Sequence, residues 1–215
     1  MKKWLVVLLL GLMLVFAAAC GNEEVQSEGE NTGETTEQNS DAEAEKGTLR
    51  WATNANWAAF CETVLPDLEA LGYDVELIVL DDTASVNVST YEGSTDFNLF
   101  QHKPYMDNYN AANNADLVMV EPYILTCRMG LASMVKSLED VDAALFQAGY
   151  LVSAGLGLDN VLAWSKDDDR FPIGVVVRAE DVDEPWVADV ISALTSERSA
   201  EVADELWEGA RVPLF

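Results

Sequence analysis

In FNLFQHKPYMDNY, residues Phe97–Tyr109, a predicted strand passes directly into a predicted helix. The segment contains His102, the only histidine in the chain, and four aromatic residues surround it. Pro104 suits the first turn of a helix, because the N–H group that proline lacks would have no partner there. We therefore predict a short strand over 95–100 and a helix over 102–112.

The alternation of strand and helix continues on both sides of this segment. Further strands are predicted over 48–53, 74–80, 115–125 and 141–146 and within 171–181; further helices are predicted over 57–73, 84–91, 147–156, 184–197 and 199–209. We expect Pro66 to bend or split the first helix, and the strand over 115–125 to run on through Pro122. Short strands that alternate with helices favour an α/β fold with a parallel sheet covered on both faces.

The segment around His102 lies where such a sheet binds ligands, beyond the carboxyl end of a strand. Phe100, His102 and Tyr105 would supply the aromatic wall and the polar group that a small amphiphilic metabolite needs. The alternative is that Phe97, Leu99 and Phe100 belong to the core and that His102 merely caps the helix. Composition alone favours neither reading.

The sequence pattern does not support a catalytic or metal site. There is no GxSxG motif, no papain-type cysteine context and no phosphate-binding loop. A single histidine without a CxxC or HxxxH motif argues against a metal site. Residues 48–215 hold 29 acidic and nine basic residues, and this negative charge argues against binding nucleic acid or an anionic lipid surface. We expect no enzyme activity, no cofactor and no metal.

Residues 1–19 have the pattern of a bacterial export signal: two lysines, an apolar run from Trp4 to Phe16 and three alanines before Cys20. The pattern resembles a lipobox, in which Cys20 is diacylated and becomes the mature N-terminus on the extracytoplasmic side of the cell membrane. An ordinary signal peptide followed by a chance cysteine is the alternative. Residues 20–47 are then the lipidated cysteine and an acidic tether too polar to fold. Cys61 and Cys127 form either a disulfide or two buried free thiols.

The segment 96–107 resembles the signature of the NlpA/MetQ family, the methionine-binding lipoproteins of ABC importers. The positions that match the family pattern are Asp96, Asn98, Phe100, Gln101, His102, Pro104, Tyr105 and Asp107. Asn87 in VNVSTYEG, the segment 140–156 and the terminal GARVPLF resemble further motifs of the family.

The resemblance implies a type II periplasmic-binding-protein fold, with the ligand in a cleft between two lobes. It implies that Phe100, His102 and Tyr105 line the first-lobe wall of the cleft and that Asn87 also binds the ligand. The implied function is that of a monomeric, membrane-anchored solute-binding protein. Such a protein delivers methionine or a related small amino acid to the permease of an ABC importer.

The folded part is short for two lobes, which need about 100 residues each. The family motif Asn-x-x-Arg-Ala-Leu, whose Asn and Arg hold the ligand carboxylate, is absent, and KSLEDVDAA over 136–144 looks like two family motifs fused. We infer an internal deletion of about 60–70 residues. Lobe one, residues 48–122 and 170–215, would be nearly complete. Lobe two, residues 123–169, would be a stub of two strands and one helix.

The deletion removes the arginine that would meet the ligand carboxylate. Arg128, on the strand that crosses between lobes, is the candidate replacement, and a surface role is its alternative. Gln147-Ala148-Gly149 stands where the family has Asn-Gly-Asn, which removes a ligand-contacting amide. We therefore expect methionine to bind far more weakly than the resemblance implies. Two other functions stay open: a lipid-anchored interaction or vestigial protein that binds no transport ligand, and a binder of another amino acid or short peptide.

Overall fold

The computed structural model describes residues 46–133, 143–159, 161–166 and 171–215. Its largest sheet contains, in spatial order, β2 (Tyr73–Leu80), β1 (Gly47–Asn54), β3 (Phe97–Asn98), β10 (Val176–Arg178) and β4 (Leu117–Met119). β1 is parallel to β2 and β3, whereas β10 is antiparallel to its neighbours β3 and β4. The α/β fold is confirmed, but the sheet is mixed, because a strand from the C-terminal part of the chain returns through its middle.

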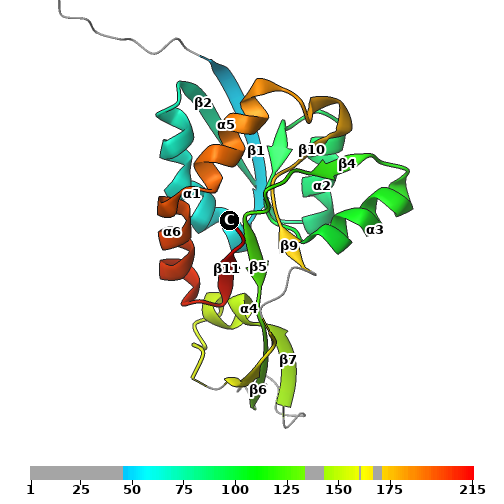
Figure 1. The fold of residues 1–215 in the computed structure, drawn as a ribbon. Coiled ribbons are helices and arrows are strands. Elements are labelled where there is room, and N and C mark those ends of the chain that lie inside the picture. Colours follow the sequence, from blue (N-terminus) through cyan, green and yellow to red (C-terminus); the bar gives the residue numbers. More distant parts are fainter. Residues whose placement is uncertain (1–45, 134–142, 160, 167–170) are drawn as a thin grey trace, which may run out of the picture. The chain divides into compact units, whose positions relative to one another are not determined.

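Helices cover both faces of this sheet (Figure 1). One layer consists of α1 (Ala55–Glu69), α5 (Pro185–Leu194) and α6 (Glu197–Trp207); the other consists of α2 (Thr83–Tyr91) and α3 (Lys103–Asn113). The core lies between the layers, where the fully buried rings of Trp51 and Phe97 stack with centroids 5.2 Å apart. Both rings come from strands, so the aromatic core holds β1 and β3 in register behind the segment that follows β3.

α1 runs through Pro66 to Glu69 as one helix, so of the two predicted effects of this proline, a bend or a split, the split is wrong. Pro66 lies in the last turn, where the loss of one hydrogen bond affects little of the helix. Phe60, Val64 and Leu68 are all fully buried along one side of α1. Burial of this apolar stripe holds the helix onto the sheet, and that contribution outweighs the local preference of proline.

The predicted continuous strand over 115–125 is also wrong, because the chain changes sheets at Pro122. β4 ends at Met119, and β5 (Leu125–Cys127) then pairs with β11 (Arg211–Pro213) and β9 (Pro172–Ile173) in a second, antiparallel sheet. A proline cannot donate to a ladder of hydrogen bonds, so a strand rarely continues through one. The strand predicted within 171–181 is divided in the same way, between β9 and β10, and is followed by the short 3-10 helix η1 (Ala179–Asp181).

A third sheet is formed by β7 (Ala143–Gln147), β6 (Met129–Ser133) and β8 (Val161–Trp164), all antiparallel. α4 (Ala148–Ser153) follows β7 directly, and Figure 1 shows this group beyond the end of β5. The sequence predicted two strands here and missed β8, which supplies the third strand that a small sheet needs. The proposed junction over 136–144 lies mostly outside the described residues.

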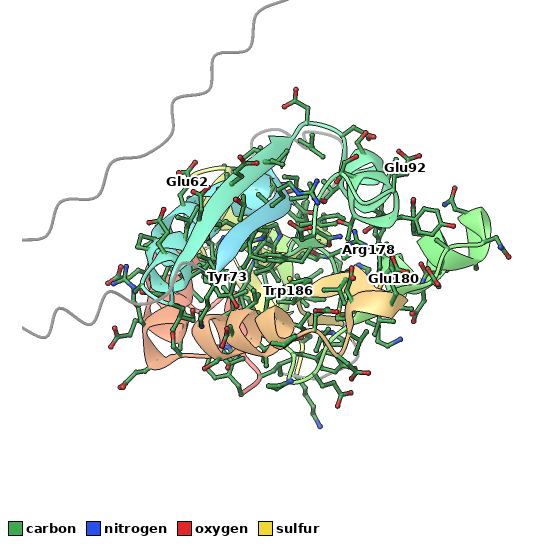
Figure 2. All side chains as sticks on the ribbon, turned by 90° about the horizontal axis from the view of Figure 1, so that it is seen from above. Glu62, Tyr73, Glu92, Arg178, Glu180 and Trp186 are labelled. Atoms are coloured by element: carbon green, nitrogen blue, oxygen red, sulfur yellow. The ribbon has the colours of Figure 1, made fainter. Side chains whose placement is uncertain are left out.

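Arg178 connects the large sheet to the turn after α2. Its Nη1 donates to the backbone oxygens of Thr90, at 2.8 Å, and Thr95, at 2.9 Å, while Nη2 lies 2.5 Å from Asp181. Seen from above in Figure 2, Arg178 lies between Glu92 and Glu180. These bonds hold the turn that leads into β3, the strand that precedes the segment around His102.

Candidate functional site

A cavity of about 130 Å³ opens at the carboxyl ends of β1 and β3. One side is built by the end of β1 and by the segment that follows β3; the other is built by the β7–α4 junction and by β11. The described residues that line it are Asn54, Trp57, Thr83, Phe100, Gln101, His102, Tyr105, Cys127, Gln147, Tyr150, Ile173 and Arg211. The cavity is where a sheet of this topology binds small molecules.

His102 both lines this cavity and caps α3. Its Nδ1 accepts a hydrogen bond from the backbone N–H of Tyr105 at 3.1 Å, and its backbone bridges to Ile173. Because Nδ1 is the acceptor, the neutral ring carries its proton on Nε2, which is left to donate to a ligand. Partial burial lowers the pKa of His102, so the ring is neutral at pH 7. His102 can therefore cap α3 and face a ligand at the same time, so the two interpretations made from the sequence are compatible.

The aromatic wall forms around that capped turn. The ring of Tyr105 meets Phe100 edge to face with centroids 6.1 Å apart, and it meets His102 in the same way at 6.3 Å. Phe171, from the segment before β9, packs against His102 at 5.5 Å. Phe97, by contrast, is fully buried and belongs to the core. Phe100 is also buried and belongs to the same core cluster, although it lines the cavity together with His102 and Tyr105. Contact of these three residues with a ligand stays a prediction.

Asn87 does not line the cavity, which differs from the prediction that it contacts ligand. It is fully buried, and its Nδ2 donates to Gln101 Oε1 at 2.9 Å while Gln101 Nε2 donates back to Asn87 Oδ1 at 2.5 Å. Gln101 also donates to Asn98 Oδ1 at 3.1 Å, and Asn98 donates to Thr90 Oγ1 at 2.9 Å. Asn87 therefore positions the side chain of Gln101, which itself lines the cavity.

Arg128 is not among the described cavity residues either. Its guanidinium lies over the ring of Trp164 at 5.1 Å, and its backbone N–H donates to the oxygen of Ala210 where the chain crosses into β6. The arginine that does line the cavity is Arg211, on β11. Sequence reasoning assigned Arg211 to a terminal motif and gave it no role. An isolated arginine inside the apolar closing segment was the available signal.

Arg211 is buried against two tryptophans. Its Cζ lies 3.9 Å from the ring centroids of both Trp57 and Trp207, and only 4% of the residue is exposed. Among the described residues, Nε and Nη1 have no hydrogen-bond partner. Burial lowers the pKa of Arg211 to about 10, so the side chain still carries its charge at neutral pH. A Cβ atom at Gly149 would come within 2.8 Å of Nε, so a glycine is needed there.

Two other hollows are less suited to a charged small molecule. One lies against the third sheet, with a described lining that holds no charged residue and includes Leu131, Leu145 and Trp164. The other lies near Lys46 and Asp189, which already pair with each other at 3.0 Å. Of these three hollows, the cavity beside His102 is the one that combines an aromatic wall with a cation, Arg211, whose Nε and Nη1 have no described acceptor.

The two cysteines of the folded part are buried free thiols, so of the two alternatives the disulfide is not formed. The thiol of Cys61 lies 3.6 Å from Thr53 Oγ1, and burial raises its pKa to about 12. Burial also raises the pKa of Cys127. Among the described residues, no group of three acidic, histidine or cysteine side chains is arranged to hold a metal ion. No helix in the described part of the chain has the length and apolar character to cross a membrane.

Comparison with known families gives a match across most of the folded part. The sequence model of the NlpA lipoprotein family matches residues 52–131 and 129–215. The chain belongs to the NlpA lipoprotein family. Because the two matched stretches meet at residues 129–131, the break in the match falls where β6 begins, and both walls of the cavity lie within matched residues.

Curated NlpA-type relatives match a shorter stretch. The D-methionine-binding lipoprotein MetQ of Yersinia pestis is 34% identical over 73 residues, which are 34% of this chain and 27% of that protein. Outer membrane lipoprotein 3 of Mannheimia haemolytica is 36% identical over 73 residues, which are 34% of this chain and 28% of that protein. The alignment thus spans less than a third of the length of these curated relatives.

Solved structures confirm the NlpA-type fold. An ABC transporter periplasmic substrate-binding protein from Coxiella burnetii superposes with a TM-score of 0.70 at 20% identity, covering 77% of this chain and 99% of that one. A nutrient-binding protein from Burkholderia cenocepacia bound to methionine gives 0.67 at 18% identity, covering 78% and 100%. The chain has the mixed α/β fold of periplasmic substrate-binding proteins.

Proposed function

We propose that the protein is a membrane-anchored, extracytoplasmic solute-binding protein of an ABC importer. Its ligand would be methionine or a related small amino acid. The observation that carries this proposal is the cavity beside His102. Its aromatic wall comes from the family's signature segment, and it opens at the carboxyl ends of β1 and β3. The Yersinia pestis relative is named for binding D-methionine, and the Burkholderia cenocepacia protein was solved bound to methionine.

The chemistry of the cavity suits an amino acid with an apolar side chain. Phe100 and Tyr105 offer ring surface to the apolar part of the ligand. The amide oxygens of Asn54 and Gln147 are acceptors that suit an ammonium group, and Nε2 of His102 is a donor. A cavity of about 130 Å³ lies below the range of about 300–1,000 Å³ that larger organic ligands occupy, which favours a small ligand.

The division of the folded part into lobes belongs to the same proposal. Lobe one comprises residues 48–122 and 170–215, and residues 123–169 are the reduced second lobe. The small third sheet with α4 is the part of that lobe which remains. The meeting of the two family matches at 129–131 supports an internal deletion near this point. The reduced lobe still contributes Gln147 and Tyr150 to the cavity.

The N-terminal segment would place the protein at the membrane. Residues 1–19 act as the lipoprotein signal, Cys20 carries the lipid, and residues 20–47 form the acidic tether. A monomer held in this way would present its ligand to the permease of an ABC importer, and it would have no enzyme activity. The NlpA lipoprotein family and the lipoprotein names of its relatives support this placement.

Calorimetric titration with L- and D-methionine tests the proposal. We expect the protein to bind one or both, and His102→Ala to weaken binding about 10-fold or more through loss of a donor and of ring contact. His102→Asn keeps a side chain that can cap α3, and so separates binding from helix stability. Asn108→Ala, an exposed change on the same helix, is the matched control and should leave affinity unchanged.

Two results would contradict the proposal. If neither methionine nor any other small amino acid releases heat at concentrations up to about 10 mM, the protein is not a transport receptor for this class. The interaction or vestigial function then becomes the better description. If methionine binds equally well to the wild type and to His102→Ala, the ligand lies elsewhere and the cavity assignment is wrong.

A further inference from the structure

A buried charge without a partner stands out in this cavity. Arg211 is 4% exposed and makes no ion pair with a described carboxylate, and neither Nε nor Nη1 meets an acceptor among the described residues. Its charge persists at neutral pH, because burial lowers its pKa only to about 10. An uncompensated buried charge is strongly destabilising, so a protein retains one where a negatively charged ligand completes it.

Two tryptophan rings pack against the guanidinium of Arg211. The ring centroids of Trp57 and Trp207 each lie 3.9 Å from Cζ, and they lie 5.1 Å from each other, so the rings cover adjacent sides of the group. Cation–π contact of this kind restrains the group without using any of its N–H donors. The backbone position is fixed as well, since Arg211 pairs with Cys127 in the second sheet.

Gly149, at the start of α4, lets the backbone of that helix lie close to Nε and Nη2 of Arg211. A Cβ atom there would lie 2.8 Å from Nε and 3.4 Å from Nη2. Gln147 and Tyr150, from the same junction, line the cavity beside the arginine. The described residues of the reduced lobe that line the cavity beside Arg211 are therefore uncharged.

The cavity lining is cationic although the chain as a whole carries a formal charge of −26. No aspartate or glutamate is among its described lining residues, and burial keeps His102 neutral at pH 7. Arg211 is thus the one permanent charge of the described lining. A planar guanidinium edge presents two parallel N–H donors, an arrangement that matches the two oxygens of a carboxylate.

We propose that Arg211 binds the carboxylate of the ligand, in place of the arginine that the family motif absent from this chain would supply. The ligand class is then a small α-amino acid, or another small monocarboxylate, whose carboxylate lies against β11 and whose apolar part lies against Phe100 and Tyr105. This inference rests on the proposed function for the identity of the cavity. With Arg211 in this role, the ligand carboxylate has a partner even though the arginine of the family motif is absent.

The first test changes the ligand and leaves the protein intact. The full protein is titrated with L-methionine and with L-methioninamide, which lacks the carboxylate, and binding is read by calorimetry and by tryptophan fluorescence. Trp57 and Trp207 flank the arginine, so a bound carboxylate should change their emission. We expect the amide to bind about 10- to 100-fold more weakly than methionine, the range expected for loss of a charge-assisted, bidentate hydrogen bond.

The second test changes the arginine. Arg211→Met is expected to leave the melting temperature unchanged or higher, because it removes a buried charge that has no described partner and its side chain still packs against the two rings. It should lower the affinity for methionine about 10- to 100-fold and abolish the preference for methionine over the amide. Arg198→Met, an exposed arginine on α6 that pairs with Asp67, is the matched control and should change neither.

The outcomes separate this inference from the proposed function. If the amide binds within about threefold of methionine, or if Arg211→Met keeps the preference, Arg211 is not the carboxylate partner and the proposed function stands. If no amino acid binds but butyrate alters the tryptophan emission of the wild type and not of Arg211→Met, the carboxylate site stands and the proposed function fails. If neither methionine nor butyrate has an effect up to about 10 mM, both are wrong.

Discussion

Substituting Asn87 by alanine would test whether the buried amide network behind the cavity holds its wall in place. Asn87 exchanges two hydrogen bonds with Gln101, at 2.9 and 2.5 Å, and it is fully buried on α2. Without Asn87, Oε1 of Gln101 loses its donor, and Nε2 keeps only the bond to Asn98 Oδ1 at 3.1 Å. Only a water molecule that enters the small void could replace the lost bonds.

The expected cost follows from these contacts. Leaving one buried acceptor unsatisfied costs about 1–3 kcal/mol, and the second lost bond costs about 1 kcal/mol more. Alanine favours the helix over asparagine by about 0.6 kcal/mol, which offsets part of the loss. We therefore expect Asn87→Ala to lower the free energy of unfolding by about 2–3 kcal/mol. For a domain of this size that is a fall of about 5–10 °C in melting temperature.

Urea unfolding followed by far-ultraviolet circular dichroism measures the change. Asn108→Ala makes the same replacement at an exposed position of α3 and should raise the free energy of unfolding by about 0.6 kcal/mol, through helix propensity alone. If Asn87→Ala does not lower the free energy of unfolding relative to this control, the reasoning is refuted. The network would then contribute nothing beyond helix propensity, and another contact would have to hold Gln101 at the cavity.

Three further predictions concern titration, thiol chemistry and the anchor. Burial lowers the pKa of His102 in the folded protein, so as the pH falls the unfolded chain binds a proton at this histidine first. The free energy of unfolding should therefore fall as the pH drops through about 6.5. In urea titrations, His102→Asn should remove that part of the pH dependence. An unchanged pH profile in the variant would show that the histidine is not linked to folding. Cys61 and Cys127 should resist iodoacetamide in the native protein and react in urea, as peptide mass spectrometry would show; labelling of either before unfolding would contradict their burial. Cys20→Ala should abolish incorporation of an alkyne-tagged fatty acid, and a variant that is still labelled would exclude Cys20 as the lipid site.

The local sequence pattern was sufficient to predict most helices and strands of the chain. Helices α2, α3, α5 and α6 and strands β1 and β2 follow from apolar periodicity and from turn residues, and each was placed within a few residues. The errors occurred where neighbours in space decide the outcome. Pro66 does not break α1, because a buried stripe holds that helix, and β8 was missed because its pairing with β6 is not visible in its own four residues.

In the candidate site too, residues that are neighbours in sequence were predicted, and residues brought together by packing were not. Phe100, His102 and Tyr105 were found because they lie within one short segment and share the geometry of a single strand end and helix start. Asn87 was assigned to the ligand because it shares a motif, whereas its burial depends on how α2 packs on the sheet. Arg211 was missed, because nothing near position 211 in the sequence indicates that two tryptophans lie against it.

The order of residues along the chain was enough to establish the fold class, the family and one wall of the cavity, since these depend on periodicity and on residues that are neighbours in sequence. Which charge faces that wall depends instead on tertiary packing. Trp57, Trp207 and Arg211 come from α1, α6 and β11, and Gly149 comes from α4. The burial of Arg211, and the lack of a hydrogen-bond partner for its Nε and Nη1 among the described residues, depend on how such distant segments pack. The cation of the cavity therefore became visible only in the folded chain.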